Sequence, residues 1–293
     1  GIRLGSTFVT LLEVILAVVG IACFGAASVC ALICLFRKHL PERCELGVPL
    51  LLAVGCVPLL AVLVLHGASE GRVPLFNSFD VLTVYGVFLA VGGAFLFARR
   101  GLHGALAILA PYVTIVVIAG LPTVLVRAGP MPHEVPNAIL LSHLVVAFAA
   151  YALFSLASVL ALAYLVQDRN FKRRNFGVVF ERLPALETLD HMMFRLVGFA
   201  FLLLTVSLVL GVYLVHESGS GRKWMTDPKI IATLVTWALY AVLVHMRANA
   251  GRHGMRLALV TLVGLVFVLF SMVGVHLFAD SVHGFIRIGG MGQ

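Results

Sequence analysis

The sequence predicts an all-α integral membrane protein, a bundle of about eight transmembrane helices. Of its 293 residues, 61% are hydrophobic and 12% are charged, whereas a soluble domain is roughly 45–50% apolar. The mean hydropathy is +1.07. A soluble fold could not bury this much apolar surface, but the hydrocarbon core of a bilayer accepts it.

Eight apolar segments follow one another along the chain. They cover residues 7–36, 47–66, 81–98, 105–126, 138–166, 194–216, 230–247 and 257–279. Each is near or above the roughly 20 residues that cross the hydrocarbon core as a helix. The first and the fifth are longer, so we expect them to tilt or to protrude. Residues 1–293 then form a single polytopic membrane domain.

Basic residues gather after every second segment, and the net charge is +8. The clusters are Arg37, Lys38 and Arg43, then Arg99 and Arg100, then Arg169, Lys172, Arg173, Arg174 and Arg182, then Arg247, Arg252 and Arg256. An excess of Lys and Arg marks cytoplasmic loops. Both termini are therefore expected on the outer side, in a multi-pass protein of the bacterial inner (cytoplasmic) membrane. Charges confined to such loops do not indicate nucleic acid as a partner.

The sequence also predicts the location of two loops and the burial of one acidic residue. Residues 167–193 mix Phe and Val with charges, which is typical of a cytoplasmic interfacial segment. Residues 217–229 form an external loop that breaks the charge alternation with Arg222, Lys223 and Lys229. Glu13 is expected to be the one buried carboxylate, accounted for by packing or a partner rather than by proton relay.

The chain has eleven histidines, which is many for so apolar a protein. The predicted topology places His66, His133, His143, His216, His276 and His283 near the outer face, and His39, His103, His191, His245 and His253 near the inner face. Polar groups at membrane depth are costly and usually face a cavity, a partner or a cofactor. For any single histidine, an interfacial position remains an alternative.

Neutral imidazole is a good ligand for haem iron. His143 lies one turn into the fifth segment and His283 just past the eighth, at similar depth. Two such rings can bind one b-type haem from both sides, so we expect bis-histidine ligation there. His245 lies beside Arg247 near the inner boundary. It is either an interfacial residue or the ligand of a second haem.

Four stretches together give the chain a resemblance to a known family. They are residues 71–80, residues 141–143 with Tyr151, residues 183–190 with Arg195, and residues 236–247 continuing to Val282-His283-Gly284-Phe285. In this order and spacing they resemble the CcsA-type cytochrome c assembly proteins, a haem-handling group with a tryptophan-rich external loop. The resemblance covers about residues 65–290.

The resemblance implies a role for three histidines. His143 and His283 would be the axial ligands of an external haem, and His245 would bind haem on its way out. The opposite ligand of that inner haem can come from a partner, so a CcsB-like membrane protein or respiratory subunits are the expected membrane partners. Apocytochrome c or a c-type cytochrome is a further expected partner. His39 is the nearest internal candidate for that ligand.

The tryptophan-type loop, residues 217–229, departs from the family pattern. Trp224, Asp227, Pro228 and Lys229 are kept, but Ser220 and Thr226 stand where tryptophans are expected, and Ile230 where a Glu is expected. Such a degenerate loop argues against full synthetase activity, although a haem-lyase component is possible by resemblance. Asp227-Pro228 either contributes to the haem site or caps the seventh span.

Lys229 and His276, in or after this loop, each have two alternative roles. Lys229 either meets a haem propionate or is an ordinary solvated loop charge. His276 stands where the family commonly has Asn, so it is either an alternative ligand or a hydrogen-bond donor to one.

Three functions are consistent with these observations. The first is a haem-binding member of the cytochrome c assembly family that holds or moves haem at the outer face. The second is a b-type haem electron-transfer membrane subunit of a respiratory complex, linked to quinone. The third is a HemX-like regulator of haem supply without catalytic activity.

Overall fold

The computed structural model describes residues 2–37, 42–70, 77–99, 102–125, 137–217, 227–250 and 254–274. Nearly all of these residues lie in helices. The helices are α1 (Ile2–Phe36), α2 (Glu42–Glu70), α3 (Ser78–Arg99), α4 (His103–Gly120), the 3₁₀ turn η1 (Leu121–Thr123), α5 (Asn137–Lys172), α6 (Val178–Arg182), α7 (Leu186–Glu217), α8 (Pro228–Ala250), α9 (Gly254–Leu269) and the π-turn η3 (Phe270–Gly274).

Eight of the described helices are long and apolar enough to cross a membrane, which confirms the predicted all-α, multi-span fold. The sixth begins earlier than its apolar segment, at Leu186 instead of residue 194. The reason is that Glu187 and Asp190 are accommodated in the first turns of a helix, where acidic side chains are favoured by the free N–H groups. Hydropathy marks the lipid-facing part of a helix and not its first turn.

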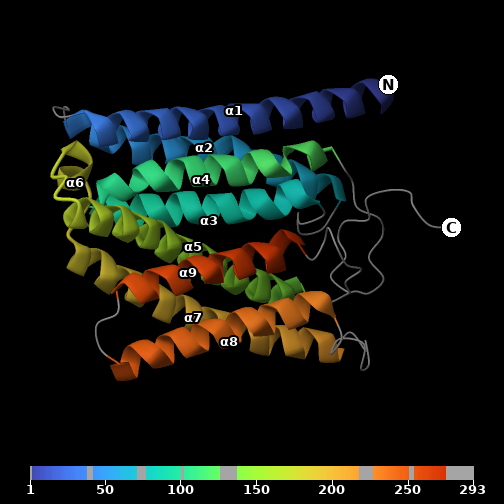
Figure 1. The fold of residues 1–293 in the computed structure, drawn as a ribbon. Coiled ribbons are helices and arrows are strands. Elements are labelled where there is room, and N and C mark those ends of the chain that lie inside the picture. Colours follow the sequence, from blue (N-terminus) through green and yellow to red (C-terminus); the bar gives the residue numbers. More distant parts are fainter. Residues whose placement is uncertain are drawn as a thin grey trace.

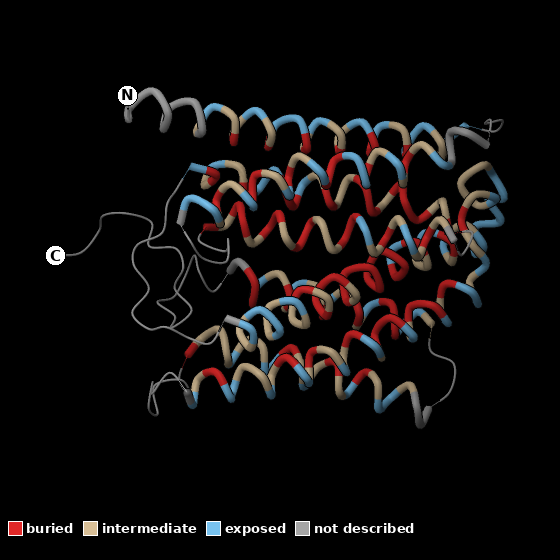
Figure 2. The backbone as a smooth tube through the Cα atoms, turned by 180° about the vertical axis from the view of Figure 1, so that it is seen from behind, coloured by how far each residue is buried: buried red, intermediate tan, exposed pale blue. Residues whose placement is uncertain are grey.

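The helices lie roughly side by side and form two groups (Figure 1). Helices α1 to α4 pack together in one group, while α7, α8 and α9 lie on the other side of α5. Helix α5 joins the groups, since it contacts α3 and α4 as well as α7 and α9. The faces turned inward are buried and those turned outward are exposed (Figure 2). This arrangement suits a bundle surrounded by lipid.

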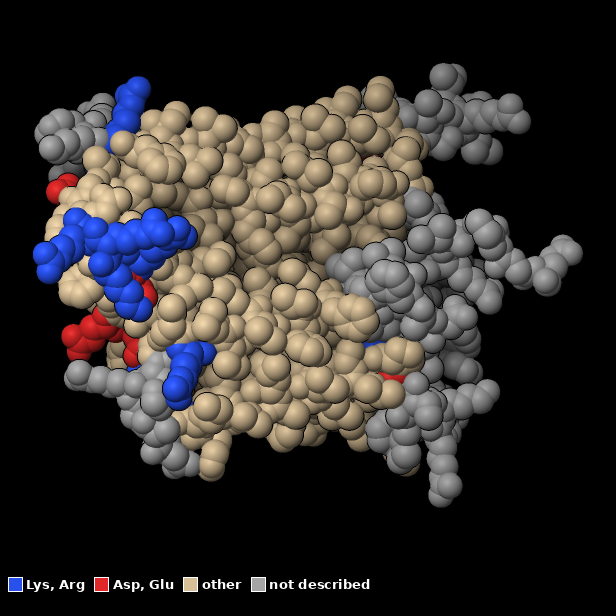
Figure 3. Space-filling view, in the orientation of Figure 1, with Lys and Arg blue, Asp and Glu red and all other residues tan. Residues whose placement is uncertain are grey.

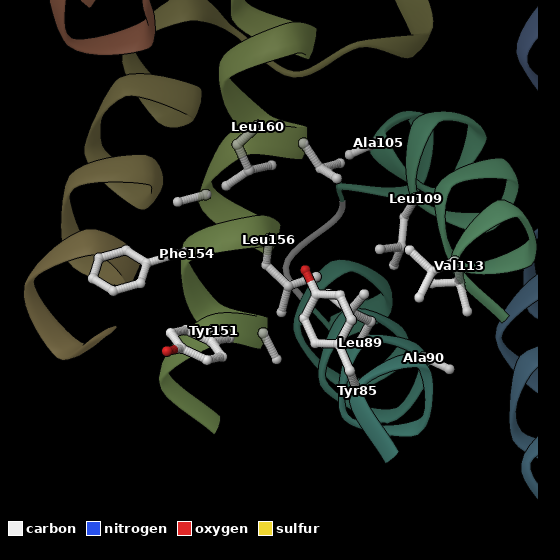
Figure 4. Packing of buried hydrophobic residues seen from close by; sticks show 14 of the residues in the cluster. Tyr85, Leu89, Ala90, Ala105, Leu109, Val113, Tyr151, Phe154, Leu156 and Leu160 are labelled. Carbon is white, nitrogen blue, oxygen red and sulfur yellow. The ribbon is translucent and has the colours of Figure 1, made fainter. Parts of the chain in front are cut away.

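The apolar core at the junction of the two groups comes from α3, α4 and α5 (Figure 4). Leu89 and Leu109 are completely buried, and so are Phe154 and Leu160 of α5. Gly93 permits the close approach of α3 and α4, because a Cβ there would lie 2.0 Å from Leu109 Cδ2. Small residues at such crossings let membrane helices pack closely.

The two ends of the bundle differ in charge. Described Lys and Arg side chains gather near α6 (Figure 3), whereas the N-terminus lies at the opposite end (Figure 1). We call these the basic end and the N-terminal end. His66, His143 and His216 lie toward the N-terminal end, and the order of the helices places His103, His191 and His245 toward the basic end. These six described histidines thus separate into the two sets that the alternating topology predicted.

Residues 167–193 comprise the last turns of α5, the short α6 and the start of α7. Gln167 of α5 donates hydrogen bonds from Nε2 to the carbonyl oxygens of Phe180 at 3.1 Å and Leu183 at 3.4 Å. Leu183 is extended, with φ −83° and ψ 143°, as expected before Pro184. These hydrogen bonds therefore hold the connection between α5 and α7 in one conformation at the basic end.

Candidate functional site

His143 lies near the start of α5 and its imidazole is half-buried against α7. Its Nδ1 lies 2.9 Å from the backbone carbonyl oxygen of Ser207 and 3.4 Å from the Ser207 hydroxyl. Gly211, one turn further along α7, makes room for the ring, because a Cβ there would lie 3.1 Å from His143 Cε1. The ring is thus fixed between a hydrogen bond and a closely packed backbone.

The carbonyl of Ser207 determines which nitrogen of His143 carries the proton. A carbonyl oxygen only accepts, so Nδ1 must be the N–H donor in this contact. Neutral imidazole then has its lone pair on Nε2, the nitrogen that a metal requires. Histidines that bind metals usually donate their other ring N–H to a carbonyl or carboxylate in this way. The arrangement of His143 therefore fits a haem-iron ligand.

Asp227 and Lys229 lie at the start of α8, toward the same end of the bundle as His143. Asp227 is buried, and its Oδ1 accepts hydrogen bonds from the backbone N–H groups of Lys229 at 2.8 Å and Ile230 at 3.3 Å. With Pro228 at the first helical position, this is an N-cap. Asp227 therefore has the capping role that was one of its two expected roles, and it fixes where the Lys229 side chain begins.

His245 lies toward the opposite end of the bundle from His143. Sixteen residues of helix separate it from Lys229, which is about 24 Å along the axis. His245 is exposed, on the same side of α8 as the exposed Val242 and Met246. His143 and His245 therefore cannot ligate the same iron, and a haem at His245 would lie on the outer wall of the bundle.

Four of the predicted site residues lie outside the described residues: Trp224, His276 and His283, together with the alternative inner ligand His39. Among the residues that the structure does describe, no group of three or more His, Cys, Asp or Glu side chains could hold a bare metal ion. His143 and His245 could each offer at most a single imidazole to an iron. That is the form in which protein side chains bind haem iron, since the porphyrin supplies the other donors.

A buried polar cluster that the sequence did not reveal connects α1, α2 and α3. His66 Nδ1 lies 2.6 Å from Asp80 Oδ1, and His66 Nε2 lies 3.7 Å from Glu13 Oε2, with all three side chains completely buried. Asn77 Oδ1 accepts the backbone N–H of Asp80 at 2.8 Å. The expectation that Glu13 is the one buried carboxylate was therefore wrong, because Asp80 at the start of α3 is equally enclosed.

The sequence feature that could have indicated this cluster is the position of each residue within its span. Glu13 is near the start of the first helix, His66 near the end of the second and Asp80 near the start of the third. Successive antiparallel helices bring these positions to one level. Their lateral contact depends on how the helices are rotated, which the sequence alone did not specify.

The fold and these sites define a class of protein, a multi-pass helical membrane protein with histidine side chains toward both ends of its bundle. The sequence model of the family described as "Cytochrome C assembly protein" matches residues 7–283, so the chain belongs to that family. This confirms the resemblance found in the sequence.

Three similar proteins share one name. The chain is 30% identical over 266 residues to "Cytochrome c biogenesis protein CcsA" of Synechococcus sp. (strain CC9902), covering 81% of this chain and 86% of the relative. It is 26% identical over 250 residues to the protein of that name in Guillardia theta, covering 79% and 83%. The Chlamydomonas reinhardtii protein is 25% identical over 246 residues, covering 80% and 67%.

Proposed function

We propose that this protein binds haem in cytochrome c assembly, holding or moving it at the outer membrane face and assisting its attachment to apocytochrome c. The observation that carries the proposal is the hydrogen bond from His143 Nδ1 to the Ser207 carbonyl, because this tautomer carries its lone pair on Nε2, as in histidines that bind a metal through that nitrogen. The relatives' name, "Cytochrome c biogenesis protein CcsA", agrees with it. The electron-transfer and HemX-like alternatives receive no comparable support.

His143 and His283 are the proposed axial ligands of the outer haem. We propose a b-type haem, which is one that is not covalently attached to this chain. In this proposal the haem is the cargo that cytochrome c assembly delivers. Lys229 places a cation toward the same end as His143, where it suits the carboxylate of a propionate. Trp224 is the proposed aromatic contact of the porphyrin face, and His276 an additional donor near His283.

His245 is the proposed ligand of a second haem at the basic end. Its exposure on the outer side of α8 means that the opposite face of this haem would meet lipid or a partner chain. A CcsB-like membrane protein that supplies the second ligand is the partner we propose. The concentration of Lys and Arg around α6 (Figure 3) supports placing this end in the cytoplasm, with the N-terminal end outside a bacterial inner membrane.

The degenerate loop limits the proposed activity. Attachment of haem vinyl groups to cysteine thiols requires close placement of the reacting atoms. Residues 217–229 lack two of the expected tryptophans at Ser220 and Thr226. We therefore propose that the chain holds and presents haem and contributes to attachment only together with its partners.

The absorption spectrum of the purified full-length protein, oxidised and then reduced, tests the proposal. We expect a bis-imidazole spectrum, and we expect His143→Ala to remove the component assigned to the outer haem. The matched control is His216→Ala, which replaces an exposed histidine at the same end and should leave the spectrum unchanged. A colourless protein after expression with ample haem, or an unchanged spectrum in His143→Ala, would refute haem binding at this site.

A further inference from the structure

An ion pair joins α7 to α8 at the basic end. Arg247 Nη2 contacts Asp190 Oδ2, and each side chain is 17% exposed. The guanidinium carbon of Arg247 also lies 5.5 Å from the centre of the Phe194 ring. Asp190 and Phe194 are four residues apart and share one face of α7. One guanidinium therefore bonds to a carboxylate and packs on an aromatic ring of the same helix face.

A second attachment lies about ten residues earlier on α8. Trp237 Nε1 donates a hydrogen bond to Thr205 Oγ1 at 3.0 Å, and its ring stacks on Phe201 with the centroids 5.5 Å apart. Two separate attachments to α7 restrict rotation of α8 about its own axis. Arg247 is the one nearer the cytoplasmic end of the helix in the proposed topology.

The direction of His245 depends on this rotation. Residues two apart on an α-helix are separated by about 200° around its axis. Arg247 points toward α7, so His245 must point to nearly the opposite side. The exposure of His245, Val242 and Met246 agrees with this direction.

The start of α7, which carries Asp190, is itself held in place by contacts with neighbouring residues. Gln167 holds the carbonyl oxygens of Phe180 and Leu183, and Leu189, next to Asp190, is completely buried. Residues 183–190, which the resemblance singled out without a role, thus form a corner that presents Asp190 to α8.

The ion pair leaves part of its own hydrogen-bonding capacity unused. Asp190 Oδ1 and Arg247 Nη1 are buried without hydrogen-bond partners. Ion pairs that are largely removed from water often add little stability compared with an apolar contact, and their best-attested use is to specify one arrangement. Here the arrangement specified is the rotational setting of α8.

We infer that Asp190 and Arg247 are positioning residues for His245, fixing the direction in which its imidazole leaves the bundle. The inference rests on the proposed function in one respect, namely that His245 binds haem. Nothing in it requires either residue to touch the haem.

Haem affinity provides the first test. In a His143→Ala chain, the remaining haem should depend on His245. Adding Asp190→Asn should weaken that haem about tenfold, the lower end of the effect of losing a group that orients a metal ligand. The exchange Asp190→Arg with Arg247→Asp should restore affinity. Asp168→Asn is the matched control, because Asp168 lies at the same end and pairs with the exposed Lys172 of its own helix, not with another helix.

A haem-independent measurement keeps the inference separate from the proposed function. A nitroxide attached to His245→Cys in the full chain reports the surroundings of position 245, after subtraction of the signal from the labelled wild-type cysteines. We expect Asp190→Asn to change its electron paramagnetic resonance spectrum and the exchanged pair to restore it. An unchanged nitroxide spectrum in Asp190→Asn would overturn the positioning role, whereas absence of His245-dependent haem with a changed spectrum would overturn only the inner haem site.

Discussion

His66 and His143 lie toward the same end of the bundle, in its two different halves, and their surroundings are opposite. His66 is completely buried between carboxylates, 2.6 Å from Asp80 and 3.7 Å from Glu13. His143 is half-buried and donates Nδ1–H to a backbone carbonyl. A porphyrin cannot approach the first ring without breaking the packing of α1, α2 and α3. The second ring is oriented by a neutral group on one side.

The comparison shows that depth in the membrane does not identify a haem ligand. Both histidines were predicted at one depth, and both lie toward the N-terminal end of the bundle. The partner of each ring makes the difference, since a carboxylate pair holds His66 as part of the helix packing, while the Ser207 carbonyl fixes a tautomer suited to iron in His143. His66 therefore belongs to the structure of the N-terminal half and His143 to the proposed haem site.

The largest effect that would test this contrast is on stability. His66→Ala leaves the Glu13 and Asp80 carboxylates buried without the imidazole between them. Removing one member of a buried ionic group costs about 3–5 kcal/mol, so we expect the free energy of unfolding in detergent to fall by that amount. Haem bound per folded molecule should stay unchanged. Haem loss at full stability would move His66 into the ligand set and end the contrast.

The next effect is on haem affinity, through the backbone opposite His143. Gly211→Val places a side chain where a Cβ alone would lie 3.1 Å from His143 Cε1, so the ring must shift. We expect haem binding to weaken about tenfold in a spectroscopic titration. Gly198→Val is the matched control on the same helix, because a Cβ at Gly198 has no neighbouring atom within 4 Å. Equal effects of the two variants would contradict the packing argument.

The smallest effect concerns the two expected roles of Asp227. Asp227→Ala removes the N-cap of α8, which costs about 1 kcal/mol, and thermal unfolding should show this loss. Asp227→Asn keeps a capping oxygen and should retain most of the stability. The haem spectrum should be unaffected in both. A changed spectrum in the Asn variant would instead indicate that the carboxylate contacts the haem.

The fold was largely predictable because lipid imposes a simple rule on sequence. Apolar segments of about 20 residues gave the eight spans, and Lys and Arg gave their alternation. The start of α7 at Leu186 was missed, since its first turns are polar and lie beyond the hydropathy signal. Lateral packing was also missed, as the contact of Glu13 with His66 shows.

The candidate site was predictable only in part. Imidazole chemistry and the family resemblance indicated His143 and His245 as ligands. The partner of His143 is a backbone carbonyl, which every residue possesses, so no side chain marked Ser207 in advance. The outward direction of His245 depends on Arg247 meeting Asp190, 57 residues away in sequence. Such long-range contacts decide orientation, and a local pattern does not contain them.

Helix α5 has consequences for how the bundle tolerates different bilayers. Its 36 residues extend about 54 Å, well beyond a hydrocarbon thickness of about 30 Å, so a thicker or thinner membrane changes only how much of α5 is wet. The apolar span of α8 has 20 residues, about 30 Å, with Lys229 and Arg247 near its ends. The charged side chains at both ends leave this span little surplus length, so α8 fixes its own depth in the lipid more narrowly than α5 does.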